Sequence, residues 1–553
     1  DHRDLHSFPT RRSSDLLVFY RTLLVLDWGV LMALMLSSRF IFRFYRENCS
    51  LLPQRFHQQP EGHATLIVGA GDAANLLIKE VQRHNNTGFK IVGLVDDNPE
   101  KQGLKLGGIP VLGQTSQLPK LIRELHVEEV IIAVPSAHKK FIRKIVACCK
   151  SSGVQFKTLP SIPDLIDGSV AISQIRKVEI DDLLGRDPVQ LDQQAISSYL
   201  TGKRVLVTGA AGSIGSEICR QVCVYNPAKL LILDSAETPL YHIEKELVSR
   251  FPDLRIIPII ADIRQRERIA TLCDSFLPQV VFHAAAYKHV PMMEYNPVEA
   301  VSNNVGGTMN LSDAAHGCGA ERFVMISTDK AVNPTNVMGA SKRAAELYVQ
   351  ALSRNSNTRF STVRFGNVLG SNGSVIPLFK KQILEGGPVT VTDPRVIRYF
   401  MTIPEACQLV LQAASLGQGN DVFVLDMGEP VRILDLAEEL IRLSGLVPYE
   451  DIDIVFSGLR PGEKLYEELL IDGEGVKPTH HEKIRIAAAV ELDWVVIKEQ
   501  IKVLLDTTAT FDTSTLLQQL KATVPEFTPQ YHFQGAPPFA FSRLRPDVVR
   551  EAS

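Results

Sequence analysis

A glycine-rich turn between an apolar segment and a helical pattern constrains the fold of this chain most strongly. Residues 203–208 predict a buried strand, a Gly-x-x-Gly-x-x-Gly turn follows at 209–215, and a helix begins at Ser216. Glycines at this spacing let backbone N–H groups approach a pyrophosphate at the helix N-terminus, where the helix dipole favours an anion. The turn therefore predicts a doubly wound α/β domain that binds a nucleotide. Its predicted cofactor contacts are Gly209, Gly212, Ser213, Ile214 and Gly215.

The strands that follow supply side chains for the rest of a dinucleotide. The strand 229–233 ends in Asp234, about twenty residues past the last glycine, as the dinucleotide pattern expects. A carboxylate there binds ribose hydroxyls and repels a 2′-phosphate, which favours NAD over NADP. We predict NAD as the cofactor and leave NADP open. Further predicted contacts are Asp262 and Ile263 after a third strand, and Ala284 and Ala285 in a fourth.

A second, weaker glycine turn lies earlier in the chain. The strand beginning at Ala64 runs into a Gly-x-Gly-x-x-Ala turn at 69–74, and another strand ends in Asp96. These features predict a small Rossmann-like domain over residues 64–160. The turn either binds a nucleotide or sugar nucleotide or only allows tight packing of a strand on a helix, and the sequence leaves both alternatives open.

The first residues resemble foreign sequence. Residues 6–15 back-translate, in one reading frame, to a common short-read sequencing adapter. We therefore interpret residues 1–15 as non-native and expect the natural N-terminus to be missing. Resequencing the source locus across this junction tests the interpretation, and genomic DNA that encodes these residues contradicts it.

An apolar stretch, 16–36, is about long enough to cross a bilayer. Arg21 and Asp27 interrupt it, which makes an isolated span costly, so it is interpreted as one helix of a larger bundle. Three arginines at 39, 43 and 46 place the following domains in the cytoplasm by the positive-inside rule. We predict a transmembrane helix with its basic flank over 16–46 and a location at the inner membrane. The alternative is a buried amphipathic helix of a soluble domain.

Length and composition agree with a soluble enzyme behind this segment. The 553 residues carry a formal net charge of −3, which argues against a nucleic-acid partner. The eight cysteines show neither Cys-x-x-Cys nor Cys/His ligand spacing, so no metal site is predicted. The predicted fold class is α/β, with two Rossmann-like doubly wound parallel-sheet domains in tandem behind the transmembrane helix. Its parts are the first domain at 64–160, a connector at 161–200, a catalytic domain at 201–480 and a C-terminal extension at 481–553 with a disordered end.

The stretch 327–342 carries the chemistry. It follows an apolar run that predicts a buried strand, so its first residues lie at a carboxyl strand end, where open α/β sheets bind ligands. Met338 and Lys342 are four residues apart and share one helix face. The short-chain dehydrogenases have Tyr-x-x-x-Lys at this spacing, and here methionine replaces the tyrosine. The residues Thr328, Asp329 and Lys330 lie upstream of this helix and add further groups that can exchange protons.

From about residue 181 to 470 the chain resembles the nucleoside-diphosphate-sugar 4,6-dehydratases of the polysaccharide-biosynthesis (CapD-like) family, an extended branch of the short-chain dehydrogenases. The matching runs are VLVTGAAGSIGSE, FHAAAYKHVPMME, STDKAVNPTNVMGASKR, VRFGNVLGSNGSVIPLF, IRYFMTIPEA and GLRPGEKLYEE. The first domain and the apolar N-terminus resemble the long, membrane-anchored members. The resemblance implies a UDP-sugar substrate, most specifically UDP-N-acetylglucosamine, and methionine in place of tyrosine is usual in those members.

A 4,6-dehydratase oxidises C4, removes water across C5–C6 and returns the hydride to C6. It needs a base for the C4 hydroxyl, a base for the C5 proton and an acid for the C6 hydroxyl. We predict that Asp329 receives the C4 proton, directly or through Thr328, and then protonates the departing C6 oxygen. Lys330, kept neutral by a desolvated site, takes the C5 proton. Lys342 holds the nicotinamide ribose and Ser327 positions the sugar.

Later segments supply the predicted substrate contacts. An arginine can clamp a diphosphate, and a glutamate can accept hydrogen bonds from ribose hydroxyls. Each of these residues has the alternative of being an ordinary surface group. The predicted set is Lys288, His289, Asn367, Arg398, Arg460 and Glu463.

Two other functions compete. A sugar-nucleotide C4 epimerase on the same fold needs no acid or base at C5–C6, so the Asp329–Lys330 pair argues against it. A non-catalytic, membrane-anchored sugar-nucleotide sensor is disfavoured by the intact glycine turn and Lys342. A homo-oligomer is also predicted.

Overall fold

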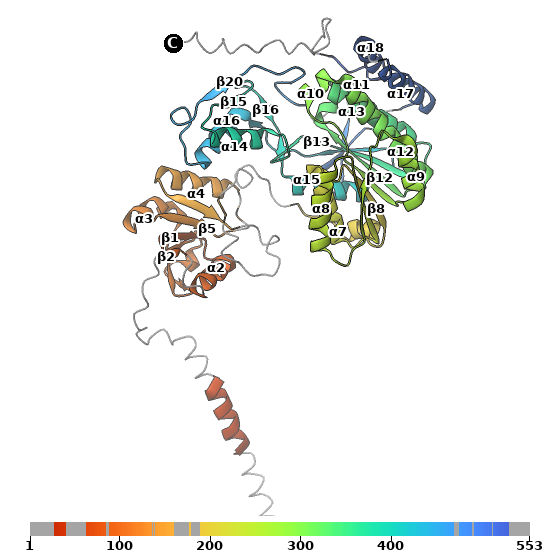
Figure 1. Ribbon diagram of the computed structural model, residues 1–553. Coiled ribbons are helices and arrows are strands. Elements are labelled where there is room, and N and C mark those ends of the chain that lie inside the picture. The colour runs from red at the N-terminus through yellow and green to blue at the C-terminus, as the bar shows by residue number, and fades with distance from the viewer. Residues whose placement is uncertain are drawn as a thin grey trace, which may run out of the picture. The chain divides into compact units, whose positions relative to one another are not determined.

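The computed structural model describes residues 27–39, 62–83, 88–134, 137, 139–159, 176–177, 189–468, 475–488, 491–510 and 512–529. The chain divides into two compact units, which are residues 1–135 with 149–176 and residues 136–148 with 177–553. Two large sheets, one of seven strands and one of nine, confirm the α/β fold class predicted from the glycine turns (Figure 1).

Near the N-terminus, residues 27–39 form a helix whose large apolar side chains, among them Trp28 and Leu34, are exposed. Within the described ranges, no helix is both long and apolar enough to cross a membrane. The predicted span began at residue 16, but residues 16–26 and 40–46 lie outside the described residues, as do residues 1–15. The structure therefore does not confirm the predicted transmembrane helix.

The seven-stranded sheet has the order β3-β4-β2-β1-β5-β6-β7. Strand β1 runs into Gly69, which has a positive φ of 104°. A side chain on Gly69 would strike Val134. The backbone N–H of Ala70 donates to Asp96 Oδ2 at 2.7 Å, which fixes the turn against the end of the second strand. The elements are β1 (His63–Val68), α2 (Asp72–Arg83), β2 (Phe89–Val95), β3 (Lys105–Leu106), β4 (Ile109–Gly113), α3 (Leu118–Glu124), β5 (Glu129–Ile132), α4 (Lys139–Ser151), β6 (Gln155–Thr158) and β7 (Arg176–Lys177).

The nine-stranded sheet has the order β10-β9-β8-β11-β12-β13-β18-β22-β21. Strands β10 to β18 are parallel, and β22 runs antiparallel to β18. The strand order reverses between β8 and β11, and ligands of open α/β sheets bind at such a switch point. The strands are β8 (Arg204–Thr208), β9 (Lys229–Asp234), β10 (Ile256–Ile260), β11 (Val280–His283), β12 (Arg322–Thr328), β13 (Arg359–Phe365), β18 (Asp421–Leu425), β21 (Val476–Pro478) and β22 (Ile484–Ala487).

Helices cover both faces of this sheet because its strands alternate two sets of apolar side chains. On β8, Leu206 belongs to one core cluster while Val205 and Val207 belong to the other. The helices of this unit outside the substrate side are α6 (Gln193–Leu200), α7 (Ser213–Val224), α8 (Glu237–Arg250), α9 (Arg266–Phe276), α10 (Val290–Tyr295), α11 (Pro297–Val301), α12 (Thr308–Gly317), α13 (Val337–Ser353), α17 (Trp494–Thr508) and α18 (Thr513–Thr523).

Helix α13 is the most enclosed helix of this face. All of its residues from Val337 to Leu352 are buried, because it packs on the sheet, α12, α17 and α18. Figure 1 shows α17 and α18 lying outside α13. These two C-terminal helices therefore cover the helix that carries Lys342. The C-terminal extension thus contributes two core helices as well as strand β22.

Smaller elements follow the main strands and build the substrate side. They pair as three two-stranded sheets, β14 with β17, β15 with β20, and β16 with β19. Figure 1 shows α14 and α16 beside β15, β16 and β20. The elements are β14 (Asn367–Val368), α14 (Val375–Leu384), β15 (Val389–Val391), β16 (Ile397–Arg398), β17 (Phe400–Met401), β19 (Val431–Arg432), α16 (Ile433–Leu443) and β20 (Ile454–Phe456). Between β17 and β18, α15 (Ile403–Leu416) returns to the nine-stranded sheet and packs on α6, α7 and β13.

Truncating the buried face of α17 tests whether the C-terminal helices are part of the core. Leu504 is fully buried, so Leu504→Ala leaves a cavity and should lower the free energy of unfolding by about 2–5 kcal/mol. On the same helix, Val503 is 38% exposed, and Val503→Ala should cost less than about 1 kcal/mol. Denaturant unfolding of both variants makes the comparison, and equal small losses contradict this account.

Candidate active site

A cavity of about 1090 Å³ lies at the switch point of the nine-stranded sheet. The glycine turn forms one wall, the end of β12 and the start of α13 form another, and the substrate-side elements close it. Most of the predicted site residues line it. They are Gly212, Ser213, Ile214, Gly215, Ala284, Lys288, His289, Ser327, Thr328, Lys330, Lys342, Asn367, Arg398, Arg460 and Glu463.

The remaining predicted residues do not line the cavity wall, namely Gly209, Asp234, Asp262, Ile263, Ala285 and Asp329. Asp262 is paired with Arg264 at 2.7 Å, and this hydrogen bond holds the pKa of the carboxyl below its usual range. Ile263 is buried in the core, and a side chain on Gly307 would strike it. Asp262 and Ile263 thus lie outside the cavity wall, and their predicted contact with a cofactor stays a prediction.

The glycine turn is shaped by close backbone approach. Gly209 has a φ of 68°, and a Cβ on it would lie 2.6 Å from Ala285 N. A Cβ on Gly215 would lie 2.0 Å from Gly209 O, so α7 can begin against the turn only with glycine there. Asp234 accepts hydrogen bonds from Ala211 N at 3.0 Å and Ala236 N at 2.9 Å, which fixes its carboxylate at the end of β9. The turn and Asp234 can hold a dinucleotide.

The residues after β12 form a compact polar cluster. Thr328 Oγ1 donates to Asp329 Oδ1 at 2.9 Å, and Lys330 Nζ donates to the same oxygen at 3.0 Å. Lys330 Nζ also donates to Asn367 Oδ1 at 3.3 Å. The backbone is held here by Gly339 of α13, because a Cβ on that residue would lie 2.0 Å from Lys330 O.

Asp329 keeps one carboxylate oxygen available. Its side chain is buried, and Oδ2 has no hydrogen-bond partner among the described residues. A Cβ on Gly366 would lie 2.9 Å from this oxygen, so glycine leaves the space beside it open. A buried carboxylate oxygen without a hydrogen-bond partner is energetically costly, so its presence needs an explanation. Accepting a proton from a bound ligand is one such explanation.

The surroundings of Lys330 favour its ammonium form, whereas the predicted base role needs a neutral amine. Its side chain lies between Asp329 and Glu467, whose Oε1 is 3.4 Å from Nζ. Burial and nearby Arg398 lower the pKa of Lys330, but the two carboxylates outweigh them and raise it above its ordinary value. The sequence shows only Asp329 as a neighbour, so the second carboxylate went unseen.

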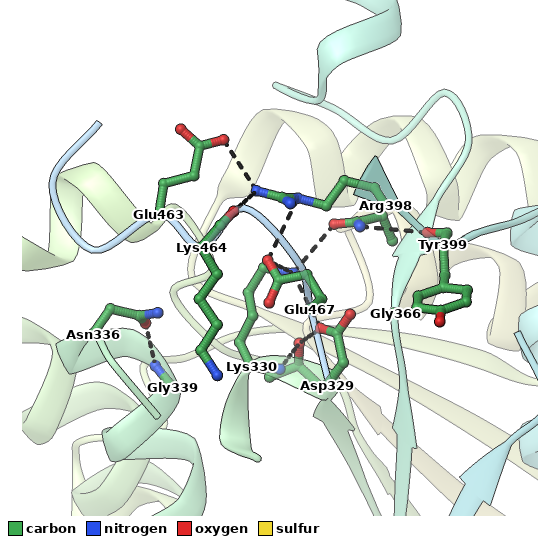
Figure 2. A network of polar contacts seen from close by, with 12 residues as sticks. Asp329, Lys330, Asn336, Gly339, Gly366, Arg398, Tyr399, Glu463, Lys464 and Glu467 are labelled. Atoms are coloured by element: carbon green, nitrogen blue, oxygen red, sulfur yellow. Dashed lines mark hydrogen bonds and ion pairs between the residues drawn. The ribbon is translucent and has the colours of Figure 1, made fainter. Parts of the chain in front are cut away.

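Glu467 joins this cluster to the substrate side (Figure 2). Arg398 lies between two glutamates, with Nε 3.5 Å from Glu467 Oε1 and Nη2 3.2 Å from Glu463 Oε1. Sequence reasoning missed Glu467, although it lies in the run GLRPGEKLYEE that carried the resemblance. The run ends in Glu467 and Glu468, and the sequence alone does not show which of the two reaches Lys330.

Lys342 faces the cavity from α13. Burial lowers the pKa of Lys342 to about 8, while the charge of Glu346 opposes that shift. Its Nζ makes no hydrogen bond within the described part of the chain, so it is free to donate to a bound ligand. Met338 lines the cavity one turn earlier and supplies an apolar wall.

A buried glutamate on α13 supports this wall. Glu346 accepts a hydrogen bond from Ser327 Oγ at 2.6 Å and two from Arg364, at 2.9 and 2.7 Å, with Arg343 at 3.1 Å. Burial raises the pKa of Glu346, but the arginines outweigh burial and lower it to about 2. The proton of Ser327 is therefore committed to Glu346, which limits the predicted role of Ser327 in positioning the sugar to its oxygen.

His283 is a further buried group that sequence reasoning passed over. Its ring contacts Thr208 Oγ1 at 2.8 Å through Nδ1 and Thr308 Oγ1 at 2.9 Å through Nε2. Thr308 donates its own proton to Asn304 O, so we assign the ring proton to Nε2. Burial, with nearby Lys342, lowers the pKa of His283 to about 3, which keeps the ring neutral beside the lysine.

The remaining substrate-side residues place positive charge at the cavity. Surrounding protein lowers the pKa of Lys288 by desolvation, and desolvation with the charges of Lys288 and Arg460 lowers that of His289. Arg460 pairs with Glu463 at 3.3 Å and is otherwise exposed. These groups can bind an anionic ligand such as a diphosphate.

The glycine turn at the switch point and the Lys342-bearing helix beside β12 define an α/β protein of the extended short-chain dehydrogenase type. Residues 205–489 match the family described as "Polysaccharide biosynthesis protein", and residues 15–160 match a "CoA-binding domain". The chain is 49% identical to the Staphylococcus aureus "Capsular polysaccharide biosynthesis protein CapD" over 462 residues, covering 83% of this chain and 76% of the relative. The chain therefore belongs to this polysaccharide-biosynthesis, CapD-like family.

Two more distant relatives match about half of the chain. A Campylobacter jejuni protein named "UDP-N-acetylglucosamine 4,6-dehydratase (inverting)" is 36% identical over 273 residues, covering 48% of this chain and 77% of the relative. A Rickettsia rickettsii protein named "UDP-glucose 4-epimerase" is 33% identical over 286 residues, covering 50% of this chain and 80% of the relative.

Removing the charge of Glu346 tests the support of the site. The depressed pKa means that this carboxylate stabilises the fold above about pH 4.5, and that the stabilisation is lost as the pH falls toward 2. Glu346→Gln removes the buried carboxylate that pairs with Arg364 and Arg343, of which Arg343 keeps its pair with Glu526, and should lower the free energy of unfolding near neutral pH by about 3–5 kcal/mol. It should also flatten the loss of stability in acid, measured by denaturant unfolding at several pH values.

The matched control is Glu385→Gln, since Glu385 pairs only loosely with Lys381 at 3.8 Å on the surface. This variant should change stability by less than about 0.5 kcal/mol. A Glu346→Gln protein with the acid dependence of the parent contradicts the role assigned to the buried carboxylate.

Proposed function

We propose that this chain is an NAD-dependent 4,6-dehydratase of a UDP-sugar, with UDP-N-acetylglucosamine as its substrate, acting in surface polysaccharide synthesis. The observation that carries the proposal is the Thr328–Asp329–Lys330 cluster at the end of β12, across the same cavity from Lys342. The cluster offers both an acid and a base where a sugar beside the cofactor exposes C5 and C6. Family membership and the relative named as a dehydratase support the same reading.

The residues at the switch point fit a dinucleotide. A Cβ on Gly212 would lie only 3.2 Å from Gly209 O, so the turn has little room for a side chain there. The bare backbone of such a turn can approach a pyrophosphate closely. Gly212, Ser213 and the start of α7 hold the phosphates, Asp234 the adenosine ribose and Lys342 the nicotinamide ribose. When bound there, NAD would supply the acceptor for the hydride from C4 and the donor for its return to C6.

The chain's own residues move the protons. Asp329 takes the C4 hydroxyl proton, with Thr328 as the hydrogen-bonded link, and later gives that proton to the departing C6 oxygen. Lys330 takes the C5 proton. Because Lys330 starts as an ammonium ion, it must first lose a proton. Neutralising Asp329 helps, since one of the two carboxylates that hold the ammonium then loses its charge.

A C4 epimerase is the second candidate, and the relative named "UDP-glucose 4-epimerase" supports it. Epimerisation needs proton exchange only at the C4 oxygen. The buried Asp329–Lys330 pair, with its additional carboxylate from Glu467, has no task in that reaction. The non-catalytic sensor is disfavoured by a cavity that combines these groups with Lys342.

We also propose that the protein is held at the cytoplasmic face of the inner membrane. The support is the apolar stretch 16–36 with the arginines at 39, 43 and 46. The activity proposed here does not depend on this attachment.

Purified protein incubated with NAD and UDP-N-acetylglucosamine should release a 4-keto-6-deoxy sugar nucleotide, seen by mass spectrometry as loss of one water. Asp329→Asn cannot carry the C4 proton to C6, so its turnover should fall by about 10²–10⁴-fold. The protein should still bind NAD, because the amide keeps the shape of the carboxylate. Its melting temperature should fall, because the buried ammonium of Lys330 loses one of its two carboxylate partners.

An epimerised product of unchanged mass favours the epimerase. If the protein forms neither a product nor reduced cofactor, the result favours the sensor. Full turnover of Asp329→Asn contradicts the acid role of Asp329 even if the keto sugar forms.

A further inference from the structure

Glu467 is placed at the meeting point of the reaction groups and the substrate side. Its Oε1 lies 3.4 Å from Lys330 Nζ and 3.5 Å from Arg398 Nε. Its side chain is 4% exposed and lines the cavity. Figure 2 shows it between Lys330 and Arg398, facing both cations.

Several hydrogen bonds anchor the segment that leads into Glu467, and these contacts fix the position of its side chain. Lys464 Nζ donates to Asn333 O at 2.9 Å, and Arg398 Nη2 donates to Lys464 O at 2.7 Å. Asn336, which caps α13 through Gly339 N, donates to Gly462 O at 3.2 Å. The segment is thus tied to the loop after β12, to the N-terminus of α13 and to β16.

We propose that Glu467 is a positioning residue that receives the ammonium proton of Lys330, so that Lys330 becomes the neutral base for C5. This inference rests on the proposed dehydratase function and adds a residue to its proton path.

Within the described part of the chain, the charges around Lys330 leave one suitable proton acceptor. The charged groups that face it are Asp329, Glu467 and Arg398, and Asn367 contributes only a neutral amide oxygen. Asp329 is occupied in the proposed reaction by the C4 proton. Glu467 is then the remaining carboxylate in contact with the ammonium. In a desolvated site, moving the proton from the ammonium to the carboxylate replaces two buried charges with two neutral groups, which burial favours.

Substrate binding assists the transfer through Arg398. In the structure Arg398 is shared between Glu463 and Glu467, and its side chain also lines the cavity. An anionic diphosphate in the cavity competes for this guanidinium. Weakening the Arg398–Glu467 pair leaves the Glu467 carboxylate available to the Lys330 ammonium when the sugar is in place.

The protons and electrons balance over the cycle. A proton passes from Lys330 Nζ to Glu467, and the neutral amine takes the C5 proton. The electron pair of the C5–H bond forms the C5–C6 double bond, and the C6 hydroxyl leaves as water with the proton held by Asp329. After the hydride returns to C6, the Lys330 ammonium returns a proton to C5 and recovers its own from Glu467.

This path predicts a distinctive pH dependence. The Lys330–Glu467 pair keeps the same total number of protons across the neutral range, so deuterium incorporation at C5 by the parent protein should be independent of pH there. Glu467→Gln has no acceptor, so Lys330 must lose its proton to solvent. The C5 incorporation rate should then be lower at neutral pH and rise about tenfold per pH unit.

The experiment is dehydration of UDP-N-acetylglucosamine in D₂O, with C5 deuterium followed by NMR and reduced nicotinamide followed by absorbance in a single turnover. Glu467→Gln should still form reduced nicotinamide, because C4 oxidation precedes the step at C5. Glu467→Asp keeps a carboxylate and should restore pH-independent incorporation. Glu463→Gln, which removes the other partner of Arg398 but not of Lys330, should raise KM while the C5 profile stays flat.

A Glu467→Gln protein whose C5 rate falls by the same factor at every pH contradicts the inference, since that pattern indicates a structural role. An unchanged C5 rate contradicts it as well. A pH-dependent Glu467→Asp profile also overturns it, even if the glutamine variant cannot be prepared. Failure of the parent protein to form reduced nicotinamide or keto sugar is a separate result, which overturns the proposed function itself.

Discussion

The buried ammonium of Lys330, held between Asp329 and Glu467, is the interaction on which the rest of the site depends. Burying a charge is costly unless it is paired, so both carboxylates must be delivered to one point. Asp329 comes from the end of β12 and Glu467 from the segment after β20. Their meeting closes the substrate side over the nucleotide-binding sheet. Gly339 and Gly366 leave the space that this arrangement needs, because a side chain on either would strike the loop or Asp329.

A second buried cluster, centred on Glu346, holds α13 against strands β12 and β13. Glu346 lies on the same helix as Lys342 and joins β12 through Ser327 and β13 through Arg364. The helix that carries Lys342 is thereby fixed to the strand that ends beside Asp329. Helices α17 and α18 bury the outer side of α13, so this arrangement also depends on the C-terminal part of the chain. In the proposed reaction, the residues for hydride transfer and those for proton transfer would therefore share one support.

Sequence patterns predicted the parts of this site that are local. The glycine turn at 209–215 and the strand end at Thr328 lie where their spacing placed them, because turns and strand ends depend on neighbouring residues. Glu467 and the partners of Glu346 come from distant segments, which no local spacing reveals. The ionisation of Lys330 likewise depends on that second carboxylate, so the sequence alone could not show how strongly its surroundings favour the ammonium form. The predicted contact of Asp262 and Ile263 with a cofactor stays a prediction, and the sequence did not show that Arg264 pairs with Asp262 or that Ile263 is buried in the core.

The central claim is that the Asp329–Lys330 pair acts on the C5–C6 edge of the sugar. A crystal structure of the protein with NAD and UDP-N-acetylglucosamine bound tests it most directly. The account predicts the C6 hydroxyl within hydrogen-bond reach of Asp329 and the C5 hydrogen directed at Lys330 Nζ, with the diphosphate near Arg398. A sugar bound with its C5–C6 edge turned away from this pair, and only C4 near the polar cluster, would contradict the account.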